Sequence, residues 1–259
     1  MSNNDSLKNI AVRLFKENIC VTPLDERSLE TVSEYMNFNS SNSDLCRRLS
    51  DVELNYVQIS SDAESANDTI IESNNIIIVA CKSLVDQWHQ GGVLLDYFYY
   101  SSETDIRDIR ASYINTLEFI RNQLRILSDS FLIISETAAQ IRACAASFTE
   151  IYKETKLAIY AAMLNRDVEA VLDCRSTSLQ AHASTKECEK LSSKLMGNAR
   201  ECSRIINCIN NMILEVNQHL NIEKYEHETQ SKVSPAMAKQ TVCSTIGVLE
   251  NIKIEKYTY

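Results

Sequence analysis

Glycine and proline are nearly absent from this sequence. The chain of 259 residues contains four glycines and two prolines, which is far below average usage. Because turns and loops depend on these two residues, we expect few turns, and a long chain with few turns must be built from long helices. The same scarcity argues against a β-sandwich, a β-barrel or an alternating α/β fold.

Long apolar runs are also missing. A run such as residues 76–81 is well short of the roughly 18 residues that a membrane-spanning helix needs, so no transmembrane helix is predicted. Lys8, Arg13 and Lys16 interrupt the first twenty positions, which argues against a cleaved signal peptide. We therefore expect a cytoplasmic protein, and release from the cell without a cleaved signal stays open.

Positive charge is in deficit. The chain carries 26 Lys and Arg against 35 Asp and Glu, a formal net charge of −9. Nucleic-acid binding depends on basic side chains that neutralise phosphates, so nucleic acid is not an expected partner. The nine cysteines are odd in number and scattered in spacing, which favours reduced thiols in a cytosolic protein.

The sequence does contain a sustained heptad pattern, in which apolar residues alternate at spacings of four and three. The pattern occurs in three segments of the chain. The first covers residues 43–90, the second begins near Ser102 and continues for about 60 residues, and the third covers residues 188–219. The buried seam of the bundle is predicted to include Leu117, Leu124, Phe131, Ile134, Ile141, Ile205 and Ile209. Such stripes must be buried against partner helices, and short connections make consecutive helices antiparallel. The predicted fold is all-α, an elongated antiparallel helical bundle of three long heptad-patterned helices with shorter flanking helices.

Three regions are expected along the chain. Residues 1–42 should form short helices and a loop, and residues 43–230 should form the long-helix coiled-coil bundle. Residues 231–259 should supply a last helix that packs on the bundle, because Pro235 suits the first position of a helix. A break between the second and third long segments is predicted at residues 165–167.

The stretch GGVLLDYFYY at residues 91–100 is the most aromatic part of the chain. Gly91 and Gly92 suit the C-cap of the first long helix, which we expect to end near Gln90. The apolar and aromatic residues of this corner are Val93, Leu94, Leu95, Tyr97, Phe98, Tyr99 and Tyr100. Two interpretations stay open: a plug over the end of the bundle, or a contact site for a partner or a membrane, whose interface tyrosine rings favour.

Long helices beside a short hydrophobic tongue resemble the soluble form of the α-helical pore-forming toxins of the cytolysin A type. That resemblance of layout implies a tongue that is released into a membrane, where the chains oligomerise. Three long helices also resemble the membrane-bending BAR domain, which implies a basic face. Lys186, Lys190 and Lys194 do form a row on one helix face, but Glu187 and Glu189 dilute its charge.

Motifs for catalysis and for cofactor binding are missing. There is no glycine-rich phosphate loop, no nucleophile elbow and no zinc-type cysteine spacing. His219, Glu223 and His227 share one helix face at a spacing that could hold a metal, but we interpret them as a solvated helix end. Asn198 falls on the seam, where a buried polar residue can fix register or partner number. We predict no catalytic residue, no metal, no cofactor and no small-molecule substrate.

These observations favour a non-enzymatic protein that acts in assembly or partner binding through its coiled-coil surfaces, with a protein partner or a second copy of itself. The alternative is an α-helical pore-forming or membrane-active protein in which the corner at residues 93–100 inserts into a membrane.

Overall fold

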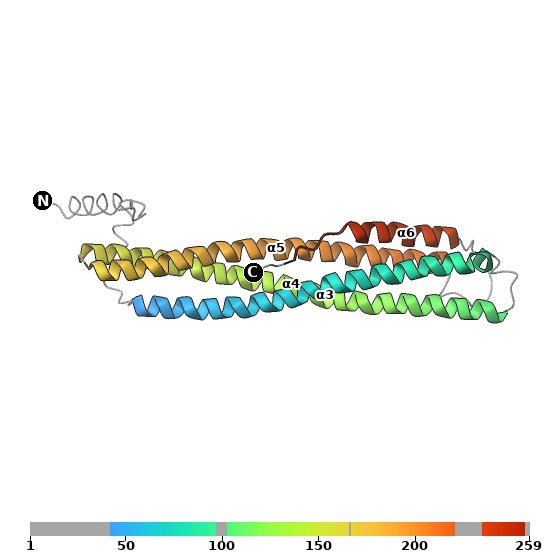
Figure 1. Ribbon diagram of the computed structural model, residues 1–259, viewed down its shortest axis with the longest axis horizontal. Coiled ribbons are helices and arrows are strands. Elements are labelled where there is room, and N and C mark those ends of the chain that lie inside the picture. Colours follow the sequence, from blue (N-terminus) through green and yellow to red (C-terminus); the bar gives the residue numbers. More distant parts are fainter. Residues whose placement is uncertain (1–41, 97–102, 166, 221–234, 257–259) are drawn as a thin grey trace. The chain divides into compact units, whose positions relative to one another are not determined.

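The computed structural model describes residues 42–96, 103–165, 167–220 and 235–256. Within these ranges the chain forms four α-helices and no strand. They are α3 (Asn42–Asp96), α4 (Glu103–Leu164), α5 (Val168–Leu220) and α6 (Pro235–Asn251). Three of them contain 55, 62 and 53 residues. The predicted all-α bundle of long helices is confirmed (Figure 1). The predicted last helix is confirmed as well, and α6 begins at Pro235.

The predicted break between the second and third long segments is confirmed, and Asp167 stabilises it. Its carboxylate oxygen Oδ1 accepts a hydrogen bond from the backbone N–H of Ala170 at 3.0 Å, as an N-cap residue does at the start of a helix. Its own N–H donates to the carbonyl of Ala162 at 2.9 Å. This second bond satisfies one of the carbonyls that the end of α4 leaves without a helical partner.

The predicted end of the first long helix is wrong. Gly91 and Gly92 do not form a C-cap near Gln90, because α3 continues to Asp96. A glycine inside a helix costs about 1 kcal/mol relative to alanine, and the two leucines that follow are strong helix formers that help to offset this cost. The helices predicted before residue 42 and the N-cap predicted at Ser102 lie outside the described residues.

The packing of the chain divides it into two compact units. Unit 1 contains the described residues among 1–59 and 140–191, and unit 2 contains those among 60–139 and 192–259. Each of the helices α3, α4 and α5 has one segment in unit 1 and another in unit 2, whereas α6 belongs to unit 2. The three regions that the sequence suggests stay a prediction.

In the described part of unit 1, segments of α3, α4 and α5 pack together. Arg48 contacts Glu154 and Asn55 contacts Cys144, so residue numbers rise on α3 as they fall on α4, and these two segments are antiparallel. Next to the α4–α5 turn, one buried cluster joins the two helices. Its members are Ile159, Tyr160, Ala162, Met163, Val171 and Cys174.

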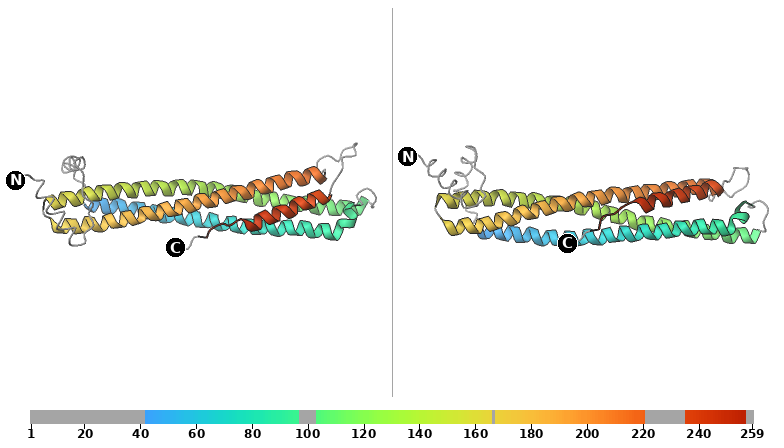
Figure 2. Two further views of the ribbon diagram at one scale, coloured as in Figure 1. Left: turned by 90° about the horizontal axis from the view of Figure 1, so that it is seen from above. Right: turned by 45° about the horizontal axis from the view of Figure 1, so that its top comes forward.

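Unit 2 is a four-helix arrangement in its described residues. Its α3 and α5 segments are parallel, because Asn198 contacts Asn67 and Met212 contacts Cys81. The α4 segment runs the other way beside α5, where the hydroxyl of Ser192 donates to the carbonyl of Ala138 at 3.1 Å. Helix α6 lies along α5 and α3, as Figures 1 and 2 show. An ion pair of 2.6 Å between Lys82 of α3 and Glu250 of α6 also joins these two helices.

Candidate protein-binding groove

A groove of about 800 Å³ lies between α3 and α4 within unit 2. Its α3 side consists of Asn75, Ile76, Val79, Ala80 and Ser83. Its α4 side consists of Ala111, Ser112, Asn115, Thr116 and Phe119. Most of these side chains are small, so the two helices leave a hollow between their outer faces instead of filling it.

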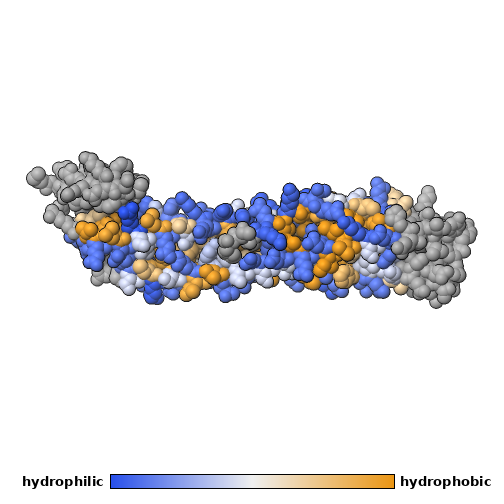
Figure 3. Space-filling model, in the orientation of Figure 1, coloured by the Kyte–Doolittle hydropathy of each residue, from blue (hydrophilic) through white to orange (hydrophobic). Residues whose placement is uncertain are grey.

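Two large apolar side chains stand out from the groove. Val79 on α3 is 67% exposed and Phe119 on α4 is 46% exposed. Figure 3 shows one face of the molecule, on which hydrophobic residues gather in several patches. Exposed apolar side chains that line one groove, as Val79 and Phe119 do, are typical of a protein contact or a ligand-binding site.

The apolar surface continues along α4 beyond the groove. Ile126 and Ile133 follow Phe119 at intervals of seven residues, and all three side chains are exposed. Residues seven apart on a helix lie on the same face. The three therefore form an exposed column, which we call the α4 column, separate from the buried seam of the same helix.

None of the ten described side chains that line the groove carries a charge. They include no His, Cys, Asp, Glu, Lys or Arg, the residue types that supply most general bases and metal ligands. The lining instead combines amide and hydroxyl groups with apolar ones. Such a surface can bind through shape, apolar contact and neutral hydrogen bonds, and it offers no group for acid–base chemistry.

The structure places most of the predicted seam residues inside the bundle. Leu117, Ile134, Ile141, Ile205 and Ile209 are buried, whereas Leu124 and Phe131 are half-buried. Asn198, also predicted on the seam, is buried. These residues stabilise the helices that form the groove, and they do not line it.

The described residues that line the groove include none from the predicted aromatic corner. The backbone of Val93, Leu94 and Leu95 belongs to the last turns of α3, and the positions of their side chains are not described. The four aromatic residues, Tyr97, Phe98, Tyr99 and Tyr100, lie outside the described residues. The same holds for Glu223 and His227 of the possible metal set, and for the side chain of His219.

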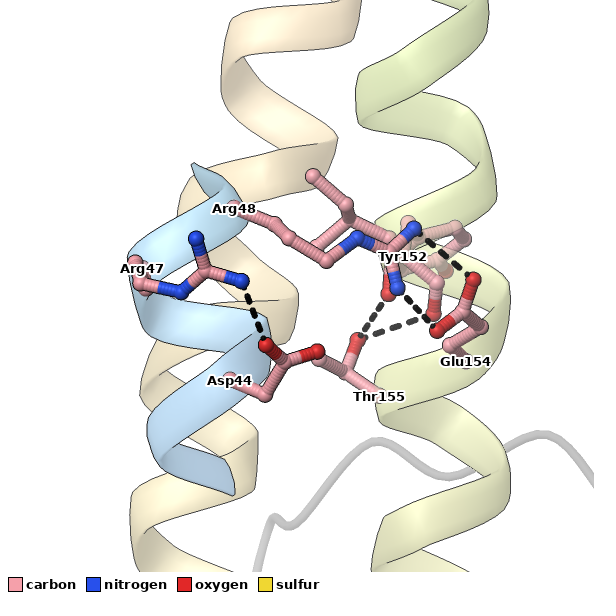
Figure 4. A network of polar contacts seen from close by, with 7 residues as sticks. Asp44, Arg47, Arg48, Tyr152, Glu154 and Thr155 are labelled. Atoms are coloured by element: carbon pink, nitrogen blue, oxygen red, sulfur yellow. Dashed lines mark hydrogen bonds and ion pairs between the residues drawn. The ribbon is translucent and has the colours of Figure 1, made fainter. Parts of the chain in front are cut away.

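In unit 1 a polar network links α3 to α4 (Figure 4). The guanidinium of Arg48 donates to both carboxylate oxygens of Glu154, at 2.6 and 3.0 Å. This two-point hydrogen bond raises the pKa of Arg48. Arg47 and Asp44 pair within α3 at 2.8 Å. The network crosslinks two helices through matched charges, which is a stabilising arrangement.

The buried thiols of the bundle are poor nucleophiles. Burial raises the pKa of Cys81, Cys188 and Cys202 to about 12, so these three thiols are protonated at neutral pH. A reactive cysteine needs the opposite environment, one that lowers its pKa and leaves it accessible. The three thiols therefore act as small apolar core residues.

Sequence reasoning missed a second buried column on α3. Ser60, Asn67, Asn74 and Cys81 are all buried, and each directly follows a residue of the seam. Their spacing of seven was visible in the sequence, but small and polar residues there resemble a solvated face. Several segments of unit 2 contact this column: Cys81 and Asn67 contact α5, and Asn74 contacts α6. The heptad pattern of α3 alone does not reveal these neighbours.

Comparison with protein-family models, with curated proteins and with solved structures finds no match to this chain. In the part of the chain that the structure describes, no helix is both long and apolar enough to cross a membrane. The same part contains no group of three or more His, Cys, Asp or Glu side chains placed to hold a metal ion.

Proposed function

We propose that this protein is a non-enzymatic assembly protein whose copies pair through the groove between α3 and α4. One observation carries the proposal: the same face contains both protruding apolar side chains, Val79 and Phe119, and a hollow of about 800 Å³ lined by small residues. In a two-fold pair each copy presents the same face, so that face must be complementary to itself. A face with a knob beside a hole meets that requirement.

The charge of the chain supports pairing at this place. At a net charge of −9, two copies repel each other at a distance. Copies can pair only where the surface is uncharged and apolar contact outweighs the repulsion. The groove lining meets this condition, because its ten side chains are all neutral.

The α4 column supplies the additional area that a stable pair needs. Specific interfaces bury roughly 800 Å² on each partner, more than a single groove between two helices provides. From Phe119 to Ile133 the column extends 14 residues along α4, or about 21 Å at the rise of an α-helix. The groove and the column together would form one elongated apolar contact.

Sedimentation equilibrium of the purified, reduced full chain tests this proposal. We expect a reversible change from the monomer mass of 29.4 kDa to twice that mass as the concentration rises. Phe119→Glu and Val79→Glu should each keep the protein monomeric, because they place a charge in the contact. Added salt should strengthen the wild-type pair, because salt screens the repulsion between acidic copies.

Leu214→Glu is the matched control. Leu214 lies on α5 in unit 2 and is 57% exposed, so its replacement adds the same charge at a similar exposure outside the groove face. It should pair like the wild type, and all variants should keep the wild-type circular dichroism spectrum. A wild type that stays monomeric at every concentration would refute the proposal, as would Phe119→Glu and Leu214→Glu variants that pair equally well.

The membrane-active alternative depends on the aromatic corner, most of which lies outside the described residues. None of the contacts of the described residues favours it.

A further inference from the structure

Two buried asparagines bind the backbone of one residue in the segment that follows α6. We call that segment, residues 252–256, the α6 extension. The Nδ2 of Asn198 donates to the carbonyl oxygen of Glu255 at 2.9 Å, and its Oδ1 accepts from the N–H of Glu255 at 3.1 Å. The Nδ2 of Asn67 donates to the same carbonyl at 3.2 Å. One residue of the extension is thus bound through both of its backbone groups.

The two asparagines are rigidly positioned. Asn67 is 1% exposed and Asn198 is 2% exposed, and the amide of Asn198 also donates to the Oδ1 of Asn67 at 2.6 Å. They come from the parallel α3 and α5 segments of unit 2, so two helices fix their side-chain amides side by side. Buried amides need hydrogen-bond partners, and here a backbone from outside the helices provides several of them.

Ile252 and Ile254 of the extension are half-buried, whereas its charged side chains contribute much less to this contact. Lys253, Glu255 and Lys256 are exposed, and the carboxylate of Glu255 lies 3.7 Å from the Nζ of Lys194. An ion pair at that distance between partly exposed groups contributes little. The site therefore recognises backbone groups first and an acidic side chain second.

The attachment of the neighbouring end of α6 is incomplete. The Nδ2 of Asn74 donates to the carbonyl of Leu249 at 3.4 Å, a long hydrogen bond. The Oδ1 of Asn74 is buried and has no hydrogen-bond partner. One acceptor next to the extension is therefore left over for a peptide N–H that the chain's own segment does not supply.

We propose that Asn67, Asn74 and Asn198 form a binding site for a non-helical peptide segment of a partner protein, with an acidic residue next to Lys194. The α6 extension occupies this site as an intramolecular ligand, and the partner peptide displaces it. Because the amides bind backbone groups, the site accepts different sequences, and Lys194 adds a preference for a carboxylate. The site lies between α3, α5 and α6, whereas the groove proposed for pairing lies between α3 and α4.

Fluorescence anisotropy with a labelled peptide tests the site. The probe is LENIKIEK, the sequence of residues 249–256, added to the full chain carrying Glu255→Pro. This substitution removes the N–H that donates a hydrogen bond to the Oδ1 of Asn198, and so weakens binding of the α6 extension to the site. We expect the variant to bind the probe at least about tenfold more tightly than the wild type, the factor that corresponds to loss of about one hydrogen bond.

Two altered peptides separate backbone from side-chain recognition without any change to the protein. A probe with alanine at the position of Glu255 keeps the backbone groups and should bind within about threefold of the native probe, since exposed ion pairs contribute little. A probe with proline there lacks the N–H and should bind about tenfold more weakly or not at all. Asn198→Ala in the Glu255→Pro protein should abolish binding of the native probe.

Several outcomes would overturn the inference. They are failure of the native probe to bind the Glu255→Pro protein, equal binding of all three probes, and undiminished binding after Asn198→Ala. Exchange of the extension between copies, instead of displacement by a partner, would show as a loss of dimer mass in Glu255→Pro. If the Glu255→Pro protein still forms dimers, the extension is not needed for pairing through the groove. The two proposals are then independent, and either one can fail without the other.

Discussion

Asn198 lies opposite Asn67 at a separation of 131 residues, and the same separation relates Met212 to Cys81 farther along the two helices. The α3 and α5 segments of unit 2 therefore keep one parallel register over about four turns of helix. The asparagine pair distinguishes this register from a shifted one, because a shift by one heptad would place Asn67 opposite Leu191 or Ile205 and break the hydrogen bond between the two amides.

Replacing both asparagines should therefore cost less stability than the two single replacements added together. Asn198→Leu leaves the amide of Asn67 buried without its partner, and we expect a loss of about 1–3 kcal/mol in the free energy of unfolding. The double variant Asn67→Leu with Asn198→Leu removes both polar groups, so its loss should be smaller than the sum of the two single losses. Urea unfolding of the four proteins measures this difference, and strictly additive losses would contradict the pairing.

The seam of α4 should be sensitive to truncation, and the outer face of the same helix should not be. Ile134 is completely buried, so Ile134→Ala should lower the free energy of unfolding by about 2–5 kcal/mol through lost contacts and a cavity. Leu132, two residues earlier, is exposed. Leu132→Ala is the matched control and should change stability by less than about 0.5 kcal/mol. Similar losses in the two variants would refute the heptad assignment.

The heptad pattern was sufficient to predict the long helices, because burial of one helix face follows directly from the spacing of apolar residues. Twelve seam positions were predicted on α3 from Leu45 to Leu84, and the structure buries all of them at least partly. The break before α5 and the start of α6 were also visible, because Asp167 and Pro235 have strong local preferences.

The features that the sequence did not reveal depend on which helices become neighbours. The buried column with Asn67 and Asn74 depends on α5, on α6 and on the segment that follows α6, and no local pattern shows where these segments pack. The groove depends on small residues of α3 facing small residues of α4, which is a property of the pair. At Gly91 and Gly92, a local preference for a C-cap was outweighed by helix-forming residues on both sides.

The buried thiols make stability fall at high pH. Burial raises the pKa of Cys81 and Cys202 from 9.0 to about 12, so the unfolded chain loses these protons at a lower pH than the folded protein does. The stabilisation is complete below pH 9 and is lost as the pH rises toward 12. At pH 10 each thiol should account for a loss of about 1.4 kcal/mol.

Urea unfolding at pH 8 and pH 10 measures this loss, and alanine variants isolate the thiol contribution from that of other groups. Replacing both Cys81 and Cys202 with alanine should reduce the difference between the two pH values by about 3 kcal/mol. The variant will be less stable at pH 8 because the core loses two sulfur atoms, so only the pH difference is compared. A pH difference equal to that of the wild type would show that these thiols ionise readily in the folded state.

Gly197 offers a way to stabilise the protein. It lies within α5 on an exposed face, and a Cβ atom added there would meet no other atom within 4 Å. Because glycine is about 1 kcal/mol less favourable than alanine inside a helix, Gly197→Ala should raise the free energy of unfolding by about that amount. Ser193→Ala, four residues earlier at an exposed position, is the matched control and should give about half the gain. Lower stability in Gly197→Ala would mean that another chain or segment approaches α5 closely at this position.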